Sequence, residues 1–406
     1  MKKYIIISIL ASLAALGGIT MVVTEYFSED NLEYYEIGLL FPTSGDFSTH
    51  GNENILAANM ALSDFNEHLE KLDKDWRLKA VTANSETDPD ISLNLVKELY
   101  AKNIGIIIGP ETSAELALIK PYIDTKEILI ISPTSTAPSL ALSEDKIYRL
   151  APDDTNQGQA ITALLKEDGI KAIILITRDD TWGNDLSSSI TNSFIENTIG
   201  DTSFRILYNP EAPHYSETNK NILFLLSTIS KSYSADEIAI VVIGFGESTE
   251  FLKNANSIDE LADFKWFGTD SNANEKKITE DKEALEFANK VGFTAVQFGS
   301  VSNDIQKDVE SRLIEQLGST PSTYAYSSYD AVWIIGQSIL EANSNHPGLL
   351  QNIIEKVAAG YVGALGDIEL NEAGDLKAAN YDIWEIIDDT WKVTGYYDHL
   401  NNEIVK

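Results

Sequence analysis

The chain has 406 residues, enough for two domains of ordinary size, each with its own hydrophobic core. Its 63 acidic residues outnumber 30 basic ones, which gives a formal net charge of −33. This argues against nucleic acid or an anionic membrane surface as a partner, since both require a basic patch. There is no cysteine, which excludes disulfides, a thiolate nucleophile, a cysteine metal site and a lipid attached to an N-terminal cysteine.

The N-terminus combines two lysines with a long apolar run. Met-Lys-Lys precedes an uncharged segment from Tyr4 to Val23. This segment is a secretory signal or a membrane anchor. Its length of about 20 residues is enough to span a bilayer, and no clear small-x-small cleavage site follows it. The balance slightly favours an uncleaved anchor, so that residues 1–33 hold the globular part outside the cytoplasm.

Strand and helix patterns alternate through the first 150 residues. Strands are expected at 36–41, 77–82, 104–108 and 128–132. Helices are expected between them, the first with apolar residues at helical spacing from Ile55 to Leu69. Runs of β-branched residues are typical of strands buried on both faces. The pattern therefore predicts a parallel sheet with helices on both of its faces.

The same alternation restarts after residue 150, where Leu-Ala-Pro-Asp-Asp marks a crossing point. It predicts a second lobe of the same α/β architecture, with strands at 172–177, 203–208, 238–243, 264–268 and 291–297. Three helical segments are then expected at 305–317, 322–341 and 348–359. The segments 366–370, 382–387 and 391–394 are expected to form an antiparallel ribbon, with Asn371-Glu-Ala-Gly-Asp as the turn between the first two.

Hydroxyl residues follow two neighbouring strands of the first lobe. Thr112 and Ser113 follow one strand, and Ser132-Pro-Thr-Ser-Thr ends the next. Ligands of parallel sheets bind outside the carboxyl ends of the strands, where hydroxyls and free N–H groups favour an anion such as a carboxylate. Taken singly, each of these residues is better explained as a helix cap or a turn former. Two adjacent strands that end in the same way favour an anion site.

Motifs of enzymes and metal sites are absent. There is no Walker A loop, no H-E-x-x-H and no G-x-S-x-G. The five histidines are scattered without ligand spacing, so neither a metal site nor a cofactor is expected. Gly244-Phe-Gly-Glu-Ser lacks the third glycine of a dinucleotide loop and is interpreted as a turn.

The remaining candidate groups suit a zwitterion held between the two lobes. Ser113, Thr134 and Thr136 would take its carboxylate, and Asp270 in the second lobe would take its ammonium. Trp182 would stack on the ligand. The alternatives are a packed rim aromatic for Trp182 and a helix N-cap for Asp270.

From about Tyr35 to Trp391 the chain resembles the type I solute-binding proteins of ABC uptake systems, in particular the leucine/isoleucine/valine-binding branch. The residues that carry the resemblance are Gly38-Leu-Leu-Phe-Pro-Thr-Ser-Gly, Ile107-Ile-Gly-Pro-Glu-Thr-Ser, Ile131-Ser-Pro-Thr-Ser-Thr-Ala-Pro, Asn156-Gln-Gly, Asp180-Thr-Trp-Gly, Tyr329-Asp-Ala and Gly366 with Gly374-Asp. The resemblance implies two Rossmann-like lobes joined by three hinge segments, which close on a ligand. The lobes would comprise 34–150 with 298–360, and 151–297 with 361–406.

The resemblance also implies roles for individual residues. Ser113 and Thr136 correspond to hydroxyls that hold the α-carboxylate of an amino acid, Thr134 to a main-chain contact, and Asp270 to the acid that pairs with the α-ammonium. Trp182 and Tyr324 stand where the branch has aromatic walls. At two positions, His50 and Phe245, the sequence departs from the branch. Both positions would line the part of the site that holds the ligand's side chain, so the identity of the ligand stays open.

The sequence therefore predicts an extracytoplasmic binding protein for an amino acid, or for a related amide or urea, that delivers its ligand to ABC permease subunits. The alternative is a membrane-anchored sensory receptor domain with the same fold. An enzyme is not expected, because no nucleophile or base constellation is present.

Overall fold

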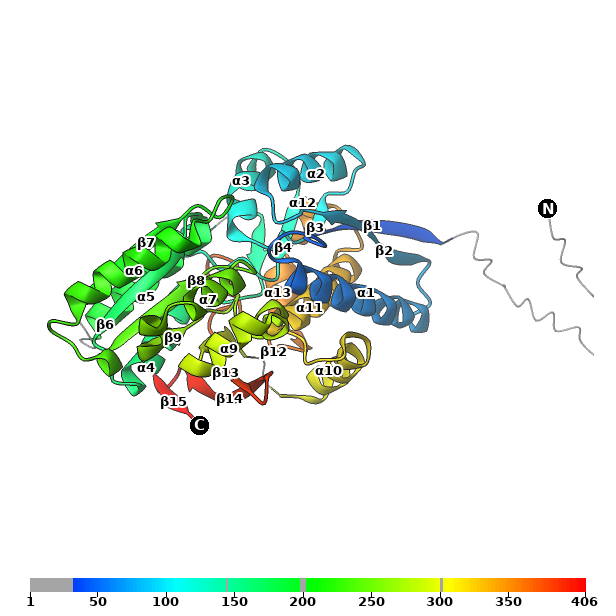
Figure 1. Cartoon of the computed structure of the whole chain (residues 1–406). Coiled ribbons are helices and arrows are strands. Elements are labelled where there is room, and N and C mark those ends of the chain that lie inside the picture. Colours follow the sequence, from blue (N-terminus) through cyan, green and yellow to red (C-terminus); the bar gives the residue numbers. More distant parts are fainter. Residues whose placement is uncertain (1–31, 144, 198–201, 300–301) are drawn as a thin grey trace, which may run out of the picture.

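The computed structural model describes residues 32–143, 145–197, 202–299 and 302–406. The described chain forms two β-sheets, each flanked by helices, that lie side by side with a third, two-stranded sheet (Figure 1). The apolar segment 4–23 lies outside the described residues. Within the described residues no helix is long and apolar enough to cross a membrane.

The first sheet is parallel throughout and belongs to the N-terminal lobe. Its strands, in spatial order, are β2 (Trp76–Asn84), β1 (Glu33–Phe41), β3 (Ile106–Ile108), β4 (Leu129–Ser132) and β5 (Ile147–Arg149). The helices of this lobe are α1 (Ser48–Lys71), α2 (Pro89–Ala101), α3 (Ser113–Asp124), α10 (Asp304–Leu317), α11 (Thr323–Ala342), α12 (Pro347–Leu350) and α13 (Ile354–Ala359).

The second sheet combines a parallel part with an antiparallel edge. Its strands, in spatial order, are β15 (Glu403–Val405), β14 (Thr390–Asp398), β13 (Tyr381–Ile387), β10 (Thr294–Phe298), β9 (Lys265–Phe267), β8 (Ile238–Ile243), β6 (Ala172–Arg178) and β7 (Thr202–Tyr208). Its helices are α4 (Asp154–Glu167), α5 (Thr181–Glu196), α6 (Tyr215–Ile229), α7 (Ser248–Asn256), α8 (Lys276–Glu280) and α9 (Lys282–Val291).

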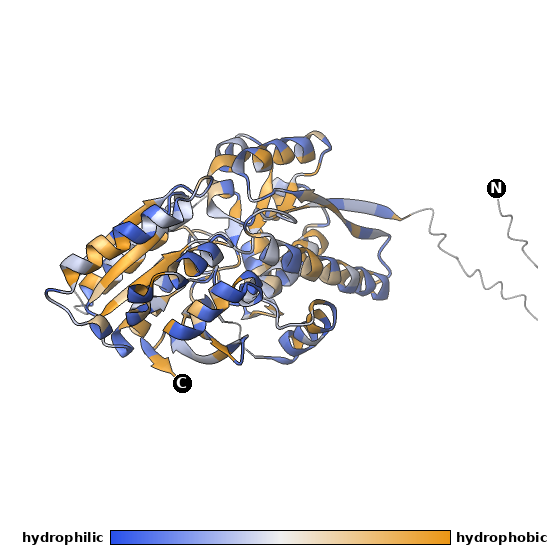
Figure 2. Ribbon diagram, viewed as in Figure 1, coloured by the Kyte–Doolittle hydropathy of each residue, from blue (hydrophilic) through white to orange (hydrophobic). Residues whose placement is uncertain are grey.

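The central strands are apolar without interruption because each face of a sheet packs on a different set of helices. In β3, Ile106 and Ile108 belong to the core that contains α1 and α11, whereas Ile107 belongs to the core that contains α2 and α3. Figure 2 shows the second sheet, around β6 and β8, as a hydrophobic layer between amphipathic helices. Continuous apolar runs are the signature of such two-sided burial.

Local signals define where several helices begin and end. Asp88 accepts hydrogen bonds from the N–H groups of Asp90 (2.8 Å) and Ile91 (3.0 Å) and so caps α2. Thr112 and Glu115 form a reciprocal capping box at the start of α3. Gly292, with φ +61°, ends α9 in the left-handed conformation.

The chain passes between the two sheets three times: after β5, after β10 and before β13. The predicted α/β fold of two Rossmann-like lobes joined by three segments is therefore confirmed. The assignment of 34–150 with 298–360 to one moving unit, and of 151–297 with 361–406 to the other, stays a prediction.

The C-terminal ribbon differs from the prediction. Only its second and third segments pair with each other, as β13 and β14. Residues 366–367 instead form β12, which pairs with β11 (Val362–Gly363). This pair packs on the first lobe, because the N–H groups of Ala364 and Leu365 donate to the buried Asp330 carboxyl (2.9 and 2.8 Å). The predicted helix at 348–359 is divided into α12 and α13.

Candidate functional site

A small buried cavity lies where loops from both lobes meet. Its walls follow the carboxyl ends of β3, β4, β6, β8 and β9, together with the start of α11. The space open to the centre of a water-sized sphere is about 10 Å³, which is room for about one water molecule. The lining residues are Phe47, Glu111, Thr112, Ser113, Thr134, Trp182, Phe245, Asp270, Ser271 and Tyr324. The position of this cavity is the one that parallel sheets give to ligands.

The structure brings most of the predicted site residues together at this cavity. Those that line it are Ser113, Thr134, Trp182, Phe245, Asp270 and Tyr324. His50 and Thr136 are buried and contact residues that line it: His50 packs on Phe47 and Tyr324, and the Thr136 N–H donates to Ser113 Oγ. Of the six predicted residues that line the cavity, five follow the ends of five different strands and Tyr324 stands at the start of α11, so their convergence is a property of the fold and not of any single segment.

Ser113 organises the first-lobe side of the cavity. It is the first residue of α3, and its Oγ accepts hydrogen bonds from the N–H groups of Thr136 (3.2 Å) and Ala137 (3.1 Å). The same hydroxyl lies 3.0 Å from that of Ser135. Within the described chain, the N–H groups of Ser113 and Ala114 have no acceptor. Free N–H groups at a helix N-terminus favour an anionic ligand group.

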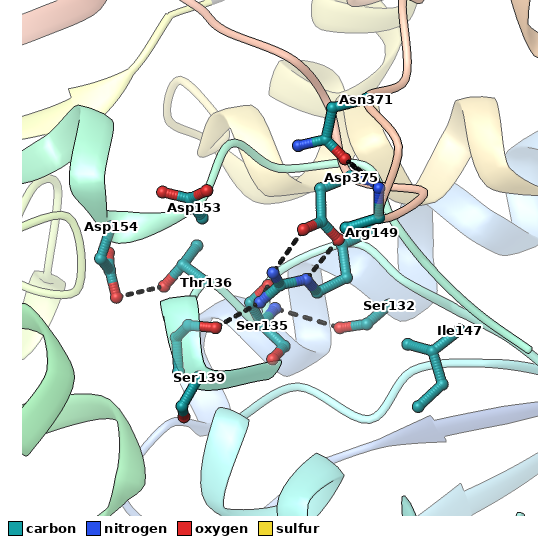
Figure 3. A network of polar contacts seen from close by, with 12 residues as sticks. Ser132, Ser135, Thr136, Ser139, Ile147, Arg149, Asp153, Asp154, Asn371 and Asp375 are labelled. Atoms are coloured by element: carbon teal, nitrogen blue, oxygen red, sulfur yellow. Dashed lines mark hydrogen bonds and ion pairs between the residues drawn. The ribbon is translucent and has the colours of Figure 1, made fainter. Parts of the chain in front are cut away.

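Thr134 and Thr136 are positioned differently although they are two residues apart. The Thr134 hydroxyl lines the cavity and donates to the backbone oxygen of Glu111. The Thr136 hydroxyl points away towards α4 and donates to Asp154 Oδ2 at 2.9 Å (Figure 3). Thr136 therefore joins the two lobes behind the cavity, and its hydroxyl does not face the ligand space.

Asp270 forms the opposite, acidic side of the cavity. Its Oδ2 accepts from the Tyr324 hydroxyl and its Oδ1 from the Ser271 N–H (2.8 Å). Gln157 accepts from the Asp270 N–H (3.1 Å) and donates to Asp154 (2.8 Å), so it links the two acids. Burial raises the pKa of Asp270, and burial together with the charge of Asp270 raises the pKa of Asp154. A cation at this point would stabilise the ionised pair.

The aromatic wall includes residues from both lobes. Trp182 stacks on Phe245 with ring centroids 4.8 Å apart and planes inclined by 24°. Phe47, in the loop that follows β1, approaches the same Phe245 ring to 4.6 Å. The Arg178 guanidinium lies over that ring, 4.3 Å from its centroid. The wall closes the cavity from solvent and joins the lobes by apolar contact.

His50 lies behind this wall on α1. Its ring packs 4.7 Å from Phe47 and stands edge-on to Tyr324 at 5.9 Å. It is 1% exposed, and neither ring nitrogen forms a hydrogen bond with a described residue. Burial lowers the pKa of His50 to about 4, so the ring is neutral at physiological pH.

Three cavity residues were not predicted from the sequence: Phe47, Glu111 and Ser271. Thr112 was named among the hydroxyls that follow the strand, but it was given no role of its own. Glu111 lies in the loop that follows β3, and Ser271 directly follows Asp270, so position after a strand end was a usable signal. Phe47 lies in a turn after β1 and had no such signal. Among the described residues no group of three or more His, Cys, Asp or Glu side chains is placed to hold a metal ion.

A buried ion pair stands where the chain crosses between the lobes. Arg149, at the end of β5, donates from Nε and Nη2 to the two Asp375 carboxyl oxygens at 2.6 and 2.5 Å (Figure 3). Its Nη1 donates to the backbone oxygen of Ala137 (2.8 Å). Arg149 thus fixes the loop that packs on Ser113 to the last crossing segment.

Comparison with known proteins gives consistent relatives. Residues 55–389 match the family described as the receptor family ligand binding region. An uncharacterized protein of Methanocaldococcus jannaschii, MJ1266, is 30% identical over 399 residues, which cover 94% of this chain and 93% of that protein. Glutamate receptor 2.1 of Arabidopsis thaliana is 26% identical over 168 residues, or 41% of this chain and 18% of the receptor.

Solved structures share the architecture at low sequence identity. The leucine-binding protein LivK of Thermotoga maritima superposes with a TM-score of 0.76 at 18% identity, over 90% of this chain and 99% of LivK. LivJ of Streptococcus pneumoniae, in complex with isoleucine, gives 0.72 at 17% identity, over 92% and 100%. A solute-binding protein of Rhodopseudomonas palustris, in complex with 3,4-dihydroxybenzoic acid, gives 0.71 at 16% identity, over 92% and 98%.

The three solved structures are of binding proteins, and the plant relative is a receptor. The predicted resemblance is therefore confirmed at the level of family and fold. The chain belongs to the receptor family ligand binding region, and it has the type I periplasmic-binding-protein fold of leucine-binding proteins.

Proposed function

We propose that this protein captures an amino acid, or a related small zwitterion, between its two lobes and delivers it to ABC permease subunits. The proposal places the globular part outside the cytoplasm, held by the segment 4–23. It assigns the protein a role in binding and not in catalysis.

One observation carries the proposal: the cavity has complementary polar groups on its two sides. The free N–H groups of Ser113 and Ala114 at the start of α3 suit a carboxylate. The Asp270 carboxyl, oriented by Tyr324, suits an ammonium. A ligand that carries both charges would bridge the lobes and stabilise their closed arrangement.

The small volume of the cavity fits a cleft that opens before a ligand enters. Phe47 of the first lobe touches Phe245 of the second, and the Gly246 N–H donates to the Asp46 oxygen at 3.2 Å. These contacts would separate when the lobes part. A ligand of micromolar affinity contributes about −8 kcal/mol, enough to favour closure over an open state of similar energy.

The experiment is a thermal-shift screen of the purified chain against amino acids, amides and ureas, followed by calorimetric titration of any compound that raises the melting temperature. Asp270→Ala is expected to weaken binding by about 2–4 kcal/mol, because it leaves the ligand ammonium buried without a partner. Asp382→Asn, which removes a half-buried carboxyl outside the cavity, is the matched control. Unchanged affinity in Asp270→Ala would reject the assignment of the site.

A receptor role is the second candidate, favoured by the match to part of a plant glutamate receptor. Genes for a permease and an ATPase beside this gene would support transport. Transport would be supported further if the ligand-loaded protein bound that permease in a pull-down from native membranes. A signalling protein recovered in place of the permease would favour the receptor role.

A further inference from the structure

A row of buried polar groups on α1 stands behind the aromatic wall of the cavity. His50, Glu53 and Asn54 share one face of the helix and are 1%, 2% and 0% exposed. Four of their polar atoms form no hydrogen bond with a described residue: Nδ1 and Nε2 of His50, Oε1 of Glu53 and Oδ1 of Asn54. The Glu53 atom lies 3.6 Å from Nζ of Lys276. A neutral imidazole has one N–H donor and one acceptor nitrogen, so one His50 nitrogen and the Asn54 oxygen are acceptors without a donor. Buried polar atoms normally have partners, so these two point to an absent donor.

Glu111 connects this row to the cavity. It lines the cavity, and both of its carboxyl oxygens accept from Asn54 Nδ2, at 2.8 and 2.9 Å. No lysine, arginine or histidine of the described chain lies within ion-pair distance of Glu111. We refer to Glu111, His50 and Asn54 together as the α1 subsite.

The charges around the cavity are unbalanced. Its wall contains two carboxyl groups, Glu111 and Asp270, and no lysine or arginine. The proposed function gives the ligand's α-ammonium to Asp270. With a neutral aliphatic side chain on the ligand, Glu111 would stay in a closed cleft without a cation, where burial raises the pKa of its carboxyl well above the ordinary value. A second positive charge on the ligand would stabilise the ionised carboxylate.

We propose that the ligand is a basic amino acid whose side-chain ammonium or guanidinium binds in the α1 subsite, paired with Glu111. The proposal rests on the proposed function and specifies its substrate class. The neutral His50 ring and the Asn54 oxygen supply further acceptors for the several N–H groups that such a side chain carries.

The test compares ligands that differ in charge but hardly in shape. Arginine is titrated against citrulline, and lysine against norleucine, by calorimetry on the full chain. We expect the basic member of at least one pair to bind tenfold or more tightly than its neutral counterpart. Glu111→Gln, which keeps the size of the side chain and removes its charge, should reduce that ratio to within about threefold of unity. The control Asp382→Asn should leave the ratio unchanged.

Each outcome is decisive. Equal binding of basic and neutral members, or tighter binding of norleucine, would overturn the α1 subsite and leave the proposed function standing. Failure of every amino acid to bind would overturn the proposed function itself. If Glu111→Gln does not fold, as judged by circular dichroism, Glu111→Asp replaces it. This variant keeps the charge at shorter reach and should retain a preference for the basic ligand.

Discussion

The ion pair between Arg149 and Asp375 offers a test of the structure that needs no ligand. Both side chains are buried, at 0% and 1% exposure, and they are 226 residues apart in the sequence. The pair links β5 to the last segment that crosses between the lobes (Figure 3). Arg149→Met would leave the Asp375 carboxylate without a partner and the Ala137 oxygen without its donor.

The expected cost of Arg149→Met is about 3–5 kcal/mol in the free energy of unfolding, because an uncompensated charge stays buried. Asp375→Leu should cost a similar amount, since the Arg149 guanidinium would keep only its backbone acceptors. The double variant replaces both charges by apolar groups, so it should cost about 1–2 kcal/mol, far less than the sum.

The assay is urea unfolding followed by circular dichroism, with the free energy extrapolated to water. The control is Lys79→Met, which breaks the exposed Lys79–Glu36 pair, with side chains 57% and 38% exposed. It should hardly change stability, because water screens an exposed ion pair. Additive single costs in the double variant, or single costs as small as the control, would refute the argument.

Three further predictions concern closure and pH. In Gly246→Ala the new Cβ would lie 2.7 Å from the Asp46 backbone oxygen. The closed arrangement should therefore lose about 1–2 kcal/mol, and ligand affinity should fall about 5–30-fold. A calorimetric titration measures the affinity, and an unchanged value would contradict this prediction. Burial raises the pKa of Asp382 to about 6 from an ordinary value near 4. The folded protein thus loses stability as the pH rises from about 4 to about 6. Asp382→Asn should be more stable than the wild type by about 1–2 kcal/mol at pH 8 and equal to it at pH 3. Melting curves of both proteins at both pH values test this prediction. Because burial raises the pKa of Asp270, binding of an ammonium must displace a proton at low pH, so affinity should decrease on acidification; titrations from pH 8 to pH 5 that show no decrease would argue against Asp270 as the ammonium site.

Much of the fold could be predicted from the sequence because its signals are local. The run from Ile104 to Ile108 is apolar at every position, and in the structure its alternate residues enter two different cores. Proline and aspartate at the start of α2 act within one helical turn. The exception is the segment at residue 366, which pairs with the nearby strand β11 and not with β13. Its strand propensity was visible, but its partner depends on tertiary packing.

The site was only partly predictable for the same reason. Ser113 and Asp270 were found because each follows a strand end, where loops of a parallel sheet meet. Thr136 fulfils the same rule, yet its hydroxyl faces Asp154. Glu111 is part of the segment Ile107-Ile-Gly-Pro-Glu-Thr-Ser, which carries the resemblance to the family. Its burial beside Asn54, however, depends on how α1 packs on the first sheet.

By itself the sequence determined which segments are strands and helices and which strand ends carry polar groups. These properties depend on the residues of a single segment and on its burial, and both are indicated by the spacing of apolar residues and by the composition of that segment. Only the tertiary structure decided which side chains share the cavity. The Tyr324 hydroxyl meets Asp270 across 54 residues, and Arg149 meets Asp375 across 226. Such contacts arise from the packing of two sheets against each other, and no local pattern encodes them.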